Sequence, residues 1–290
     1  MLKVIKPGIL TTIQDQGRKK YRSFGVPISG VMDHYAASCA NEIMGNSWEA
    51  AVIEITMGNV TFEVIEDTEL AVTGADLNAE VDGKPLPMWQ LIQVTAGSQL
   101  TFKGPKAGMR AYLALPGGIE SERYLGSQSV YEKAGFGRAL DKDDRVMGRL
   151  KNAKANQSLE AMEIPTYTKQ TTVRVIPSHH EHQFTTDSLD CFYREGFTIK
   201  AADRMGCQLE GECLERKENT DILSEATTFG TIQVPSEGNP IILLADAQTT
   251  GGYPTIGTIV FEDLWRVAQM PPGGELYFER YTISEWSKGE

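Results

Sequence analysis

The strongest candidate for a functional site is a polar run that contains two glycines. It directly follows a short aliphatic stretch. Residues 241–245 lead into Asp246-Ala247-Gln248-Thr249-Thr250-Gly251-Gly252-Tyr253-Pro254. Asp246 and Gln248 are two residues apart, so they share one face if the segment is extended. The two glycines let the backbone approach a ligand and present N–H donors to it. The run therefore predicts either a ligand site or a polar turn in which Asp246 caps backbone amides.

Arg204 offers a second reactive group, within Ala202-Asp203-Arg204-Met205-Gly206. Its planar guanidinium suits bidentate recognition of a carboxylate or a phosphate. A structural ion pair with a nearby acidic residue is an equally good interpretation, because such pairs are common in proteins. We predict that Arg204 and the run beginning at Asp246 converge on one pocket, which a second polypeptide completes.

A third segment, near the N-terminus, reads Thr11-Thr12-Ile13-Gln14-Asp15-Gln16-Gly17-Arg18 and precedes the helical pattern that begins at Asp33. Such a loop could bind an anion at the helix N-terminus. It could equally be a capped turn that holds its own lobe together. Gln14, Asp15 and Arg18 are its candidate functional residues.

Three of the four histidines lie in His179-His180-Glu181-His182. On a strand, His180 and His182 would share a face, whereas Glu181 would not. A zinc site needs three or four convergent ligands, and no cysteine is close in sequence. We therefore predict a hydrogen-bonded loop and no metal; proton transfer by one histidine is an alternative.

Composition excludes several classes of protein. The net charge of −11 disfavours binding to nucleic acid and to anionic membranes. The sequence has no apolar run long enough to span a membrane and no pattern typical of a signal peptide. Its four cysteines form no CxxC pair, which indicates reduced thiols in the cytoplasm. There is no Walker loop, GxGxxG, GxSxG or HExxH motif, so we expect a subunit that shares its site with a partner.

Short alternating or β-branched segments separated by turn residues predict a mainly β chain with a few short helices. Helices are expected from Asp33 to Gly45, near 187–194, and around 261–268. The length of 290 residues suits about two domains, with a linker near 151–170 between an N-terminal β lobe (1–155) and a C-terminal β lobe (171–290). Strands are expected at 2–6, 60–66, 91–94, 100–103, 110–115, 172–176, 231–234, 240–245, 257–261 and 276–281.

These motifs occur together in an order that is typical of one family. They are TTIQDQGR with Gly25, Gly30 and Asp33; Ala40-Asn41, Gly45-Asn46, Glu54 and Gly58; Tyr112-Leu113-Ala114 with Gly117-Gly118-Ile119; Gly126-Ser127 with Ser129; Arg204-Met205-Gly206; GTIQVP at 230–235; and DAQTTGGYP. Over nearly its whole length the chain resembles the allophanate hydrolase subunit 2 family, also called the KipA or PxpC family of biotin-dependent carboxyltransferase-like proteins.

The resemblance implies two β-barrel-like lobes of cyclophilin-like architecture and a partner of the KipI or PxpB type. It implies the PxpC-type subunit of an ATP-dependent 5-oxoprolinase, which with a PxpA-type subunit opens 5-oxoproline to glutamate. ATP would be shared with, or supplied by, the partner subunits. The alternatives are a regulatory protein that antagonises KipI, and the carboxyltransferase subunit of a urea carboxylase. Ala161-Met162-Glu163 has no lysine for biotin, so biotin would have to arrive on another chain.

In the 5-oxoprolinase interpretation, Arg204 would clamp an anion, and Asp246 would orient donors or act as a base. Gln233 and Gln248 would position a lactam or amide substrate, and Gln14, Asp15 and Arg18 would support the site. The remaining expected substrate-binding residues are Thr249, Thr250, Gly251, Gly252 and Tyr253.

The sequence departs from the family pattern at two places, Pro177-Ser178 and Cys207-Gln208. The family usually has Gly-Pro at the first place and an aromatic residue followed by arginine at the second. Loss of that arginine would weaken binding of an anionic substrate by ~1.5–3 kcal/mol if the contact were direct. The second departure therefore bears on the substrate more than on the fold.

Overall fold

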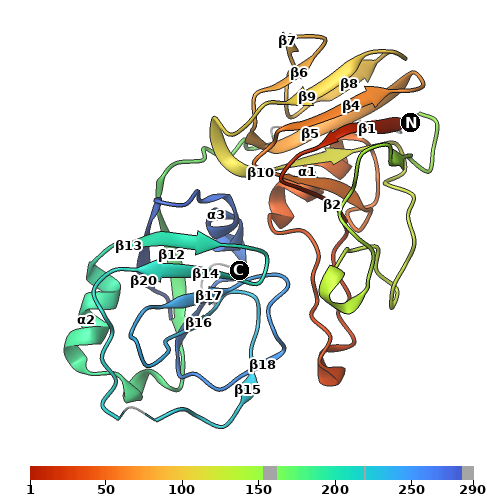
Figure 1. Cartoon of the computed structure of the whole chain (residues 1–290). Helices are drawn as coiled ribbons and strands as arrows, with labels where there is room; N and C mark the ends of the chain where they lie inside the picture. The colour runs from red at the N-terminus through yellow and green to blue at the C-terminus, as the bar shows by residue number, and fades with distance from the viewer. Residues whose placement is uncertain (153–161, 219, 283–290) are drawn as a thin grey trace. The chain divides into compact units, whose positions relative to one another are not determined.

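The computed structural model describes residues 1–152, 162–218 and 220–282. It divides into two compact units, of which unit 1 comprises Met1–Arg18 and Ser29–Tyr167 and unit 2 comprises Lys19–Ile28 and Thr168–Glu290 (Figure 1). Residues 19–28 were expected in the first lobe, whereas the structure groups them with the second. Residues 153–161 of the expected linker lie outside the described residues.

Unit 1 is built from two antiparallel sheets (Figure 1). Their facing sides alternate along each strand: Ile53 and Ile55 point into the core between the sheets, while Val52 points to the opposite face. The same period of two made the strand at 60–64 recognisable from its apolar alternation. The strand at 52–56 was not expected: it is buried at every position because both of its faces are covered. One sheet has the order β11 (Arg145–Val146), β1 (Leu2–Pro7), β4 (Val60–Val64), β9 (Gln99–Phe102), β6 (Ala79–Val81), β7 (Lys84–Pro85); the other has the order β2 (Leu10–Gln14), β3 (Val52–Thr56), β10 (Ala107–Ala114), β5 (Thr68–Asp76), β8 (Leu91–Val94).

Helix α1 (His34–Ile43) covers the outer face of the second sheet. Ala36, Ala40 and Ile43 pack there against Tyr112 and other strand residues. The helix begins where the sequence predicted, because the Asp33 carboxylate accepts a hydrogen bond from the Ala36 N–H. Small residues on this face allow a close approach to the sheet.

Unit 2 contains a closed barrel of seven strands (Figure 1). β12 runs parallel to β20 and antiparallel to β19, and the other neighbours are antiparallel. A separate two-stranded sheet pairs β15 (Glu225–Ala226) with β18 (Thr250–Gly251). The barrel order is β12 (Gln170–Pro177), β19 (Thr255–Ile259), β16 (Thr231–Gln233), β17 (Ile241–Leu243), β14 (Gly206–Glu210), β13 (Phe197–Ala202), β20 (Glu275–Arg280).

The helices of unit 2 are short. α2 (Thr186–Arg194) buries Cys191 and Phe192, and the Phe192 ring stacks on Phe278 of β20. α3 (Leu264–Gln269) follows a 3₁₀ turn, Phe261–Asp263. The expectation of a mainly β chain with a few short helices is confirmed, and the closed barrel lies in unit 2, whereas unit 1 has two packed sheets. Within the described ranges, no helix is both long and apolar enough to span a lipid bilayer.

Candidate functional site

A tight turn between β13 and β14 sets the position of Arg204. The Asp203 carboxylate accepts hydrogen bonds from the Met205 and Gly206 N–H groups, at 2.7 and 2.9 Å. The Asp203 N–H donates to the Gly206 carbonyl at 3.1 Å and closes the turn. Asp203 is therefore the turn-forming residue that holds Arg204 at the end of the hairpin.

Arg204 and Asp246 form a buried ion pair. Arg204 Nε and Nη2 donate to the two oxygens of Asp246, at 2.8 and 3.1 Å. The two side chains are only 8% and 9% exposed, and the Asp246 N–H also donates to the Arg204 carbonyl. A buried, bidentate pair of this kind fixes the two segments to each other. The structure thus brings together the two sequence motifs that were expected to converge.

A pocket of about 380 Å³ adjoins this pair. Three glutamines, Gln208, Gln233 and Gln248, and one aromatic residue, Tyr253, are among the residues that line it. Arg204 and Asp246 do not line it, although Asp203 and Met205 do. Gln208 occupies the second place where the sequence departs from its family, so that departure lies in the pocket wall. The other lining residues are Ala201, Ala202, Gly206, Ile241 and Leu243.

Gln233 has hydrogen-bonding capacity that the chain does not use. It is 3% exposed, and its Nε2 atom has no hydrogen-bond partner among the residues that the structure describes. Its Oε1 atom lies 3.4 Å from the exposed Gln248 amide nitrogen. A buried amide N–H without a partner costs roughly 1–3 kcal/mol. The Nε2 atom has almost no accessible surface and lies against Gly251, so a ligand carbonyl would pair with it only after the amide rotates towards the pocket.

Gly251 makes room for this amide. A Cβ atom built on Gly251 would lie 2.2 Å from Gln233 Nε2, whereas one on Gly252 would have no atom closer than 3.4 Å. Only the first glycine of the pair is therefore required by the geometry of the pocket.

The backbone from Thr249 to Gly252 is largely engaged in pairing with residues 222–227. The Thr249 carbonyl accepts a hydrogen bond from the Thr227 N–H at 3.0 Å, and the Gly252 carbonyl accepts one from the Ile222 N–H at 3.0 Å. Thr250 pairs with Ala226 across the two-stranded sheet. Residues 249–252, expected as donors to a ligand, are absent from the described lining of the pocket and hold its edge in place.

Arg22 is a residue that the sequence analysis missed. It lies in the 3₁₀ turn Arg22–Phe24, and its guanidinium donates to the carbonyls of Thr227 and Thr249. One cation thus bridges β15 and β18 at their common end. The signal available in the sequence was the cluster Lys19-Lys20-Tyr21-Arg22 after Arg18.

Asp15, by contrast, lies in unit 1 and organises a closed loop cluster. Its carboxylate accepts hydrogen bonds from the Gly17 and Gln128 N–H groups and from the Ser127 and Ser129 hydroxyls, at 2.6–2.8 Å. In the same cluster, Arg18 donates to the Ser129 carbonyl and Gln14 to the Val130 carbonyl. These contacts fit the capped-turn interpretation of the N-terminal segment.

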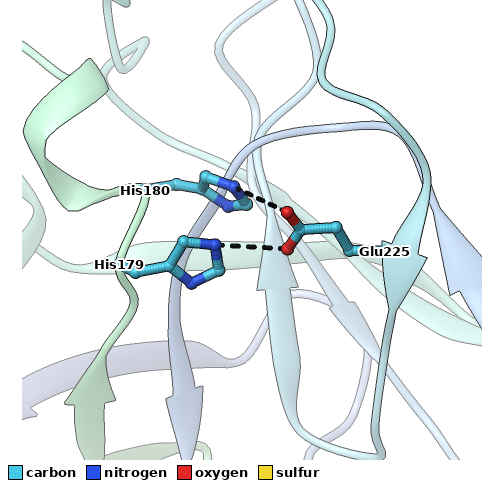
Figure 2. Close-up of side chains that lie close together, drawn as sticks. All are labelled: His179, His180 and Glu225. Carbon is cyan, nitrogen blue, oxygen red and sulfur yellow. Dashed lines mark ion pairs between the residues drawn. The ribbon is translucent and has the colours of Figure 1, made fainter.

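His179 and His180 converge on Glu225 (Figure 2). His179 Nε2 lies 3.2 Å from one carboxylate oxygen and His180 Nε2 lies 3.7 Å from the other. Burial, followed by the neighbouring His179, lowers the pKa of His180. His182 does not join them: it lies in a 3₁₀ turn rather than on a strand, and its Nδ1 contacts the His179 carbonyl at 2.7 Å. The expected hydrogen-bonded loop is present, and within it two imidazoles and one carboxylate lie close together.

Comparison with known proteins identifies the family. The model of the carboxyltransferase domain, subdomain A and B, matches residues 24–280. The chain belongs to this family. Because the match extends across both units, the family assignment covers the barrel, the pocket and the paired sheets together.

Two curated relatives match almost end to end. The chain is 37% identical over 98% of its length to the C-subunit of 5-oxoprolinase from Escherichia coli, of which it covers 93%. It is 34% identical over 99% of its length to the protein of the same name from Haemophilus influenzae, of which it covers 94%.

A solved structure shares the fold. The crystal structure of K. lactis urea amidolyase superposes with a TM-score of 0.87 at 25% identity over 96% of this chain. The chain spans only 18% of that protein, so it corresponds to one part of a much larger enzyme.

Proposed function

We propose that this chain is the PxpC-type subunit of an ATP-dependent 5-oxoprolinase, a complex that opens 5-oxo-L-proline to L-glutamate. The observation that carries the proposal is the near full-length match to two 5-oxoprolinase subunits. Each match covers more than 90% of both chains. The chain would act as one member of the complex and be inactive alone.

The pocket of unit 2 would bind the lactam. A lactam presents one N–H donor and one C=O acceptor, and a carboxamide side chain complements both. Gln233 Nε2, which is buried against Gly251 and lacks a partner among the described residues, would donate to the ring carbonyl once the amide rotates towards the pocket. Gln208 and Gln248 would bind the remaining polar atoms, and Tyr253 would cover the apolar edge of the ring.

The Arg204–Asp246 pair would position this wall rather than touch the substrate. Two guanidinium nitrogens are engaged by Asp246, and neither residue lines the pocket. The pair instead fixes the β13–β14 turn, with pocket residues Asp203 and Met205, to the segment that leads to Gln248. A direct anion clamp at Arg204 would require Asp246 to release it, which is costly for a buried pair.

ATP would activate the lactam, because an amide is resonance-stabilised and resists direct attack by water. The described pocket lining has three carboxamides and one carboxylate but no lysine or arginine, so it suits a lactam better than a triphosphate. Nucleotide binding would therefore fall to partner subunits of the KipI or PxpB type and the PxpA type. The four cysteines form no disulfide in the described part of the chain, and we place the complex in the reducing cytoplasm.

The direct test is glutamate release from 5-oxoproline and ATP by the chain co-purified with its two partners. Gln233→Leu should lower kcat/KM by roughly tenfold, because a hydrogen bond to the ring carbonyl is lost. Gln93→Leu changes an exposed glutamine of β8 and serves as the matched control. A fully assembled wild-type complex without turnover would refute the proposal.

The structural likeness to urea amidolyase favours a second candidate, a carboxyltransferase acting on urea or a related amide. That activity would depend on biotin carried by another chain. Urea in place of 5-oxoproline, with and without avidin, separates the two candidates: avidin-sensitive consumption of urea would favour the carboxyltransferase. Partner binding without turnover on either substrate would instead favour a regulatory KipI antagonist.

A further inference from the structure

We propose that His179, His180 and Glu225 form a binding site for a divalent transition metal of the zinc class. The three side chains come from two segments more than 40 residues apart, the turn after β12 and strand β15, and meet at one point (Figure 2). The proposal concerns a site separate from the glutamine pocket, and it does not rest on the proposed 5-oxoprolinase activity.

The distances lie within reach of coordination. The ligand atoms of the three residues are all within 4.8 Å of one another. Bonds of about 2.0–2.2 Å around a tetrahedral zinc ion place ligand atoms roughly 3.3–3.6 Å apart. His179 Nε2 lies 3.2 Å from one Glu225 oxygen, slightly closer than this separation, and His180 Nε2 lies 3.7 Å from the other oxygen, slightly farther.

The three side chains differ in exposure. The His180 side chain is 7% exposed and held by its surroundings, whereas those of His179 and Glu225 are 69% and 48% exposed. The two exposed side chains can rotate towards an ion that binds first to His180. Two imidazoles and one carboxylate suit zinc, and they leave a fourth position open.

A second set of contacts orients the His180 ring. Its Nδ1 lies 3.2 Å from the Thr255 hydroxyl, and that hydroxyl lies 2.6 Å from the Ser178 hydroxyl. The Ser178 hydroxyl oxygen also accepts a hydrogen bond from the His180 N–H at 3.1 Å. The Thr255 N–H also lies near Nδ1, with the two nitrogens 3.5 Å apart, so the shorter contact with the hydroxyl is the one that an Nδ1–H would make. In that tautomer Nε2 carries the lone pair on the side of Glu225 and is free to bind a metal. Such an outer partner is typical of metal-binding histidines, because it sets the tautomer and direction of the ring.

The ion would tie two elements together. Glu225 lies in β15, directly opposite Gly251 of β18, while both histidines follow β12. Occupancy would therefore cross-link the two-stranded sheet to the barrel. Binding to the folded chain should also raise the unfolding temperature, because the unfolded chain lacks the assembled site.

The experiment is calorimetric titration of the chelator-treated full chain with Zn²⁺, with thermal unfolding in parallel. We expect saturable binding of one ion in the micromolar range and a rise in Tm. Because loss of an outer partner typically costs 10–100-fold in affinity, Thr255→Val should weaken binding by about that factor, and His179→Ala or Glu225→Gln by more. His179 and Glu225 are exposed enough for these variants to fold.

Two controls distinguish this site from incidental binding. His182→Ala removes a histidine three residues from His179 that does not point to Glu225, and Cys213→Ser removes an exposed thiol. Both variants should bind Zn²⁺ like the wild type. No saturable binding would overturn the proposal. So would an affinity that survives His179→Ala combined with Glu225→Gln, or one that either control abolishes.

Discussion

The loop cluster around Asp15 in unit 1 and the glutamine pocket in unit 2 are both rich in polar side chains, yet they use them differently. Asp15 accepts four hydrogen bonds from neighbouring residues of its own unit. Gln233 is equally buried, but its Nε2 atom has no partner in the described part of the chain. The Asp15 carboxylate is thus satisfied within its own unit, although Oε1 of the neighbouring Gln14 has no hydrogen-bond partner among the described residues. What distinguishes Gln233 is that its unpaired amide belongs to a residue that lines a pocket.

This difference shows what separates a structural cluster from a binding site when the residue types look alike. Buried polar groups are nearly always paired, so an unpaired one in a pocket wall indicates a missing partner. Charge and glycine content do not separate a structural cluster from a binding site. The hydrogen bonds made within the chain do separate them: they indicate a structural role for Asp15 and a binding role for Gln233.

The Arg204–Asp246 pair provides the largest expected effect. Both side chains have hydrogen-bond partners within the chain, so we assign the pair a structural role. Its loss should therefore reduce the stability of unit 2. Arg204→Met leaves the buried Asp246 carboxylate without its cation and should cost about 3–5 kcal/mol in the free energy of unfolding. Denaturant unfolding, followed by a probe in unit 2, measures this change.

Two further variants control that experiment. The double variant Arg204→Met/Asp246→Leu removes both charges and should recover much of the loss. Arg138→Met breaks an exposed pair with Asp144 in unit 1 and should cost no more than about 1 kcal/mol. If Arg204→Met lowers activity while leaving unfolding unchanged, the guanidinium binds a ligand, and the positioning role is wrong.

Asp15 provides the second effect and tests the closed cluster directly. Asp15→Ala leaves the Gln128 N–H and the Ser127 hydroxyl without their acceptor, so we expect about 2–3 kcal/mol of lost stability. Gln233→Leu, whose amide nitrogen has no partner to lose, should change stability by less than about 1 kcal/mol. Unfolding of both variants, set beside their kcat/KM, should give opposite patterns. Matching patterns would remove the distinction between the two clusters.

Several elements of the fold could be predicted from local sequence patterns. The Asp33 cap, the aliphatic strand before Asp246 and the helix near 187–194 were all recognisable, because capping and apolar periodicity act over a few residues. The convergence of Arg204 and Asp246 was also predicted, with the family resemblance as its guide. These features depend on neighbours in sequence or on motifs that occur together.

Contacts between residues that are far apart in the chain could not be predicted from the sequence. Arg22 joins unit 2 although Arg18, four residues earlier, belongs to unit 1, and no local pattern marks that change. Glu225 was not connected with His179 because the two meet only when β15 pairs with β18. A turn in place of a strand likewise separated His182 from His180. In each case tertiary contacts decided which side chains meet.

Substitution of the two glycines of the polar run should have the smallest effect on activity. The two variants can be compared directly with each other. In Gly251→Ala the new methyl group would displace the flexible Gln233 amide, so we expect roughly a fivefold loss of kcat/KM, about 1 kcal/mol. Gly252→Ala should be close to neutral, because its Cβ would meet only ordinary van der Waals contacts. Both glycines lie on the same short segment, so any general effect on folding should be shared. Equal activities of the two variants would mean that the Gln233 amide does not contact the substrate, whereas a loss confined to Gly251→Ala would mean that the amide binds the reacting lactam.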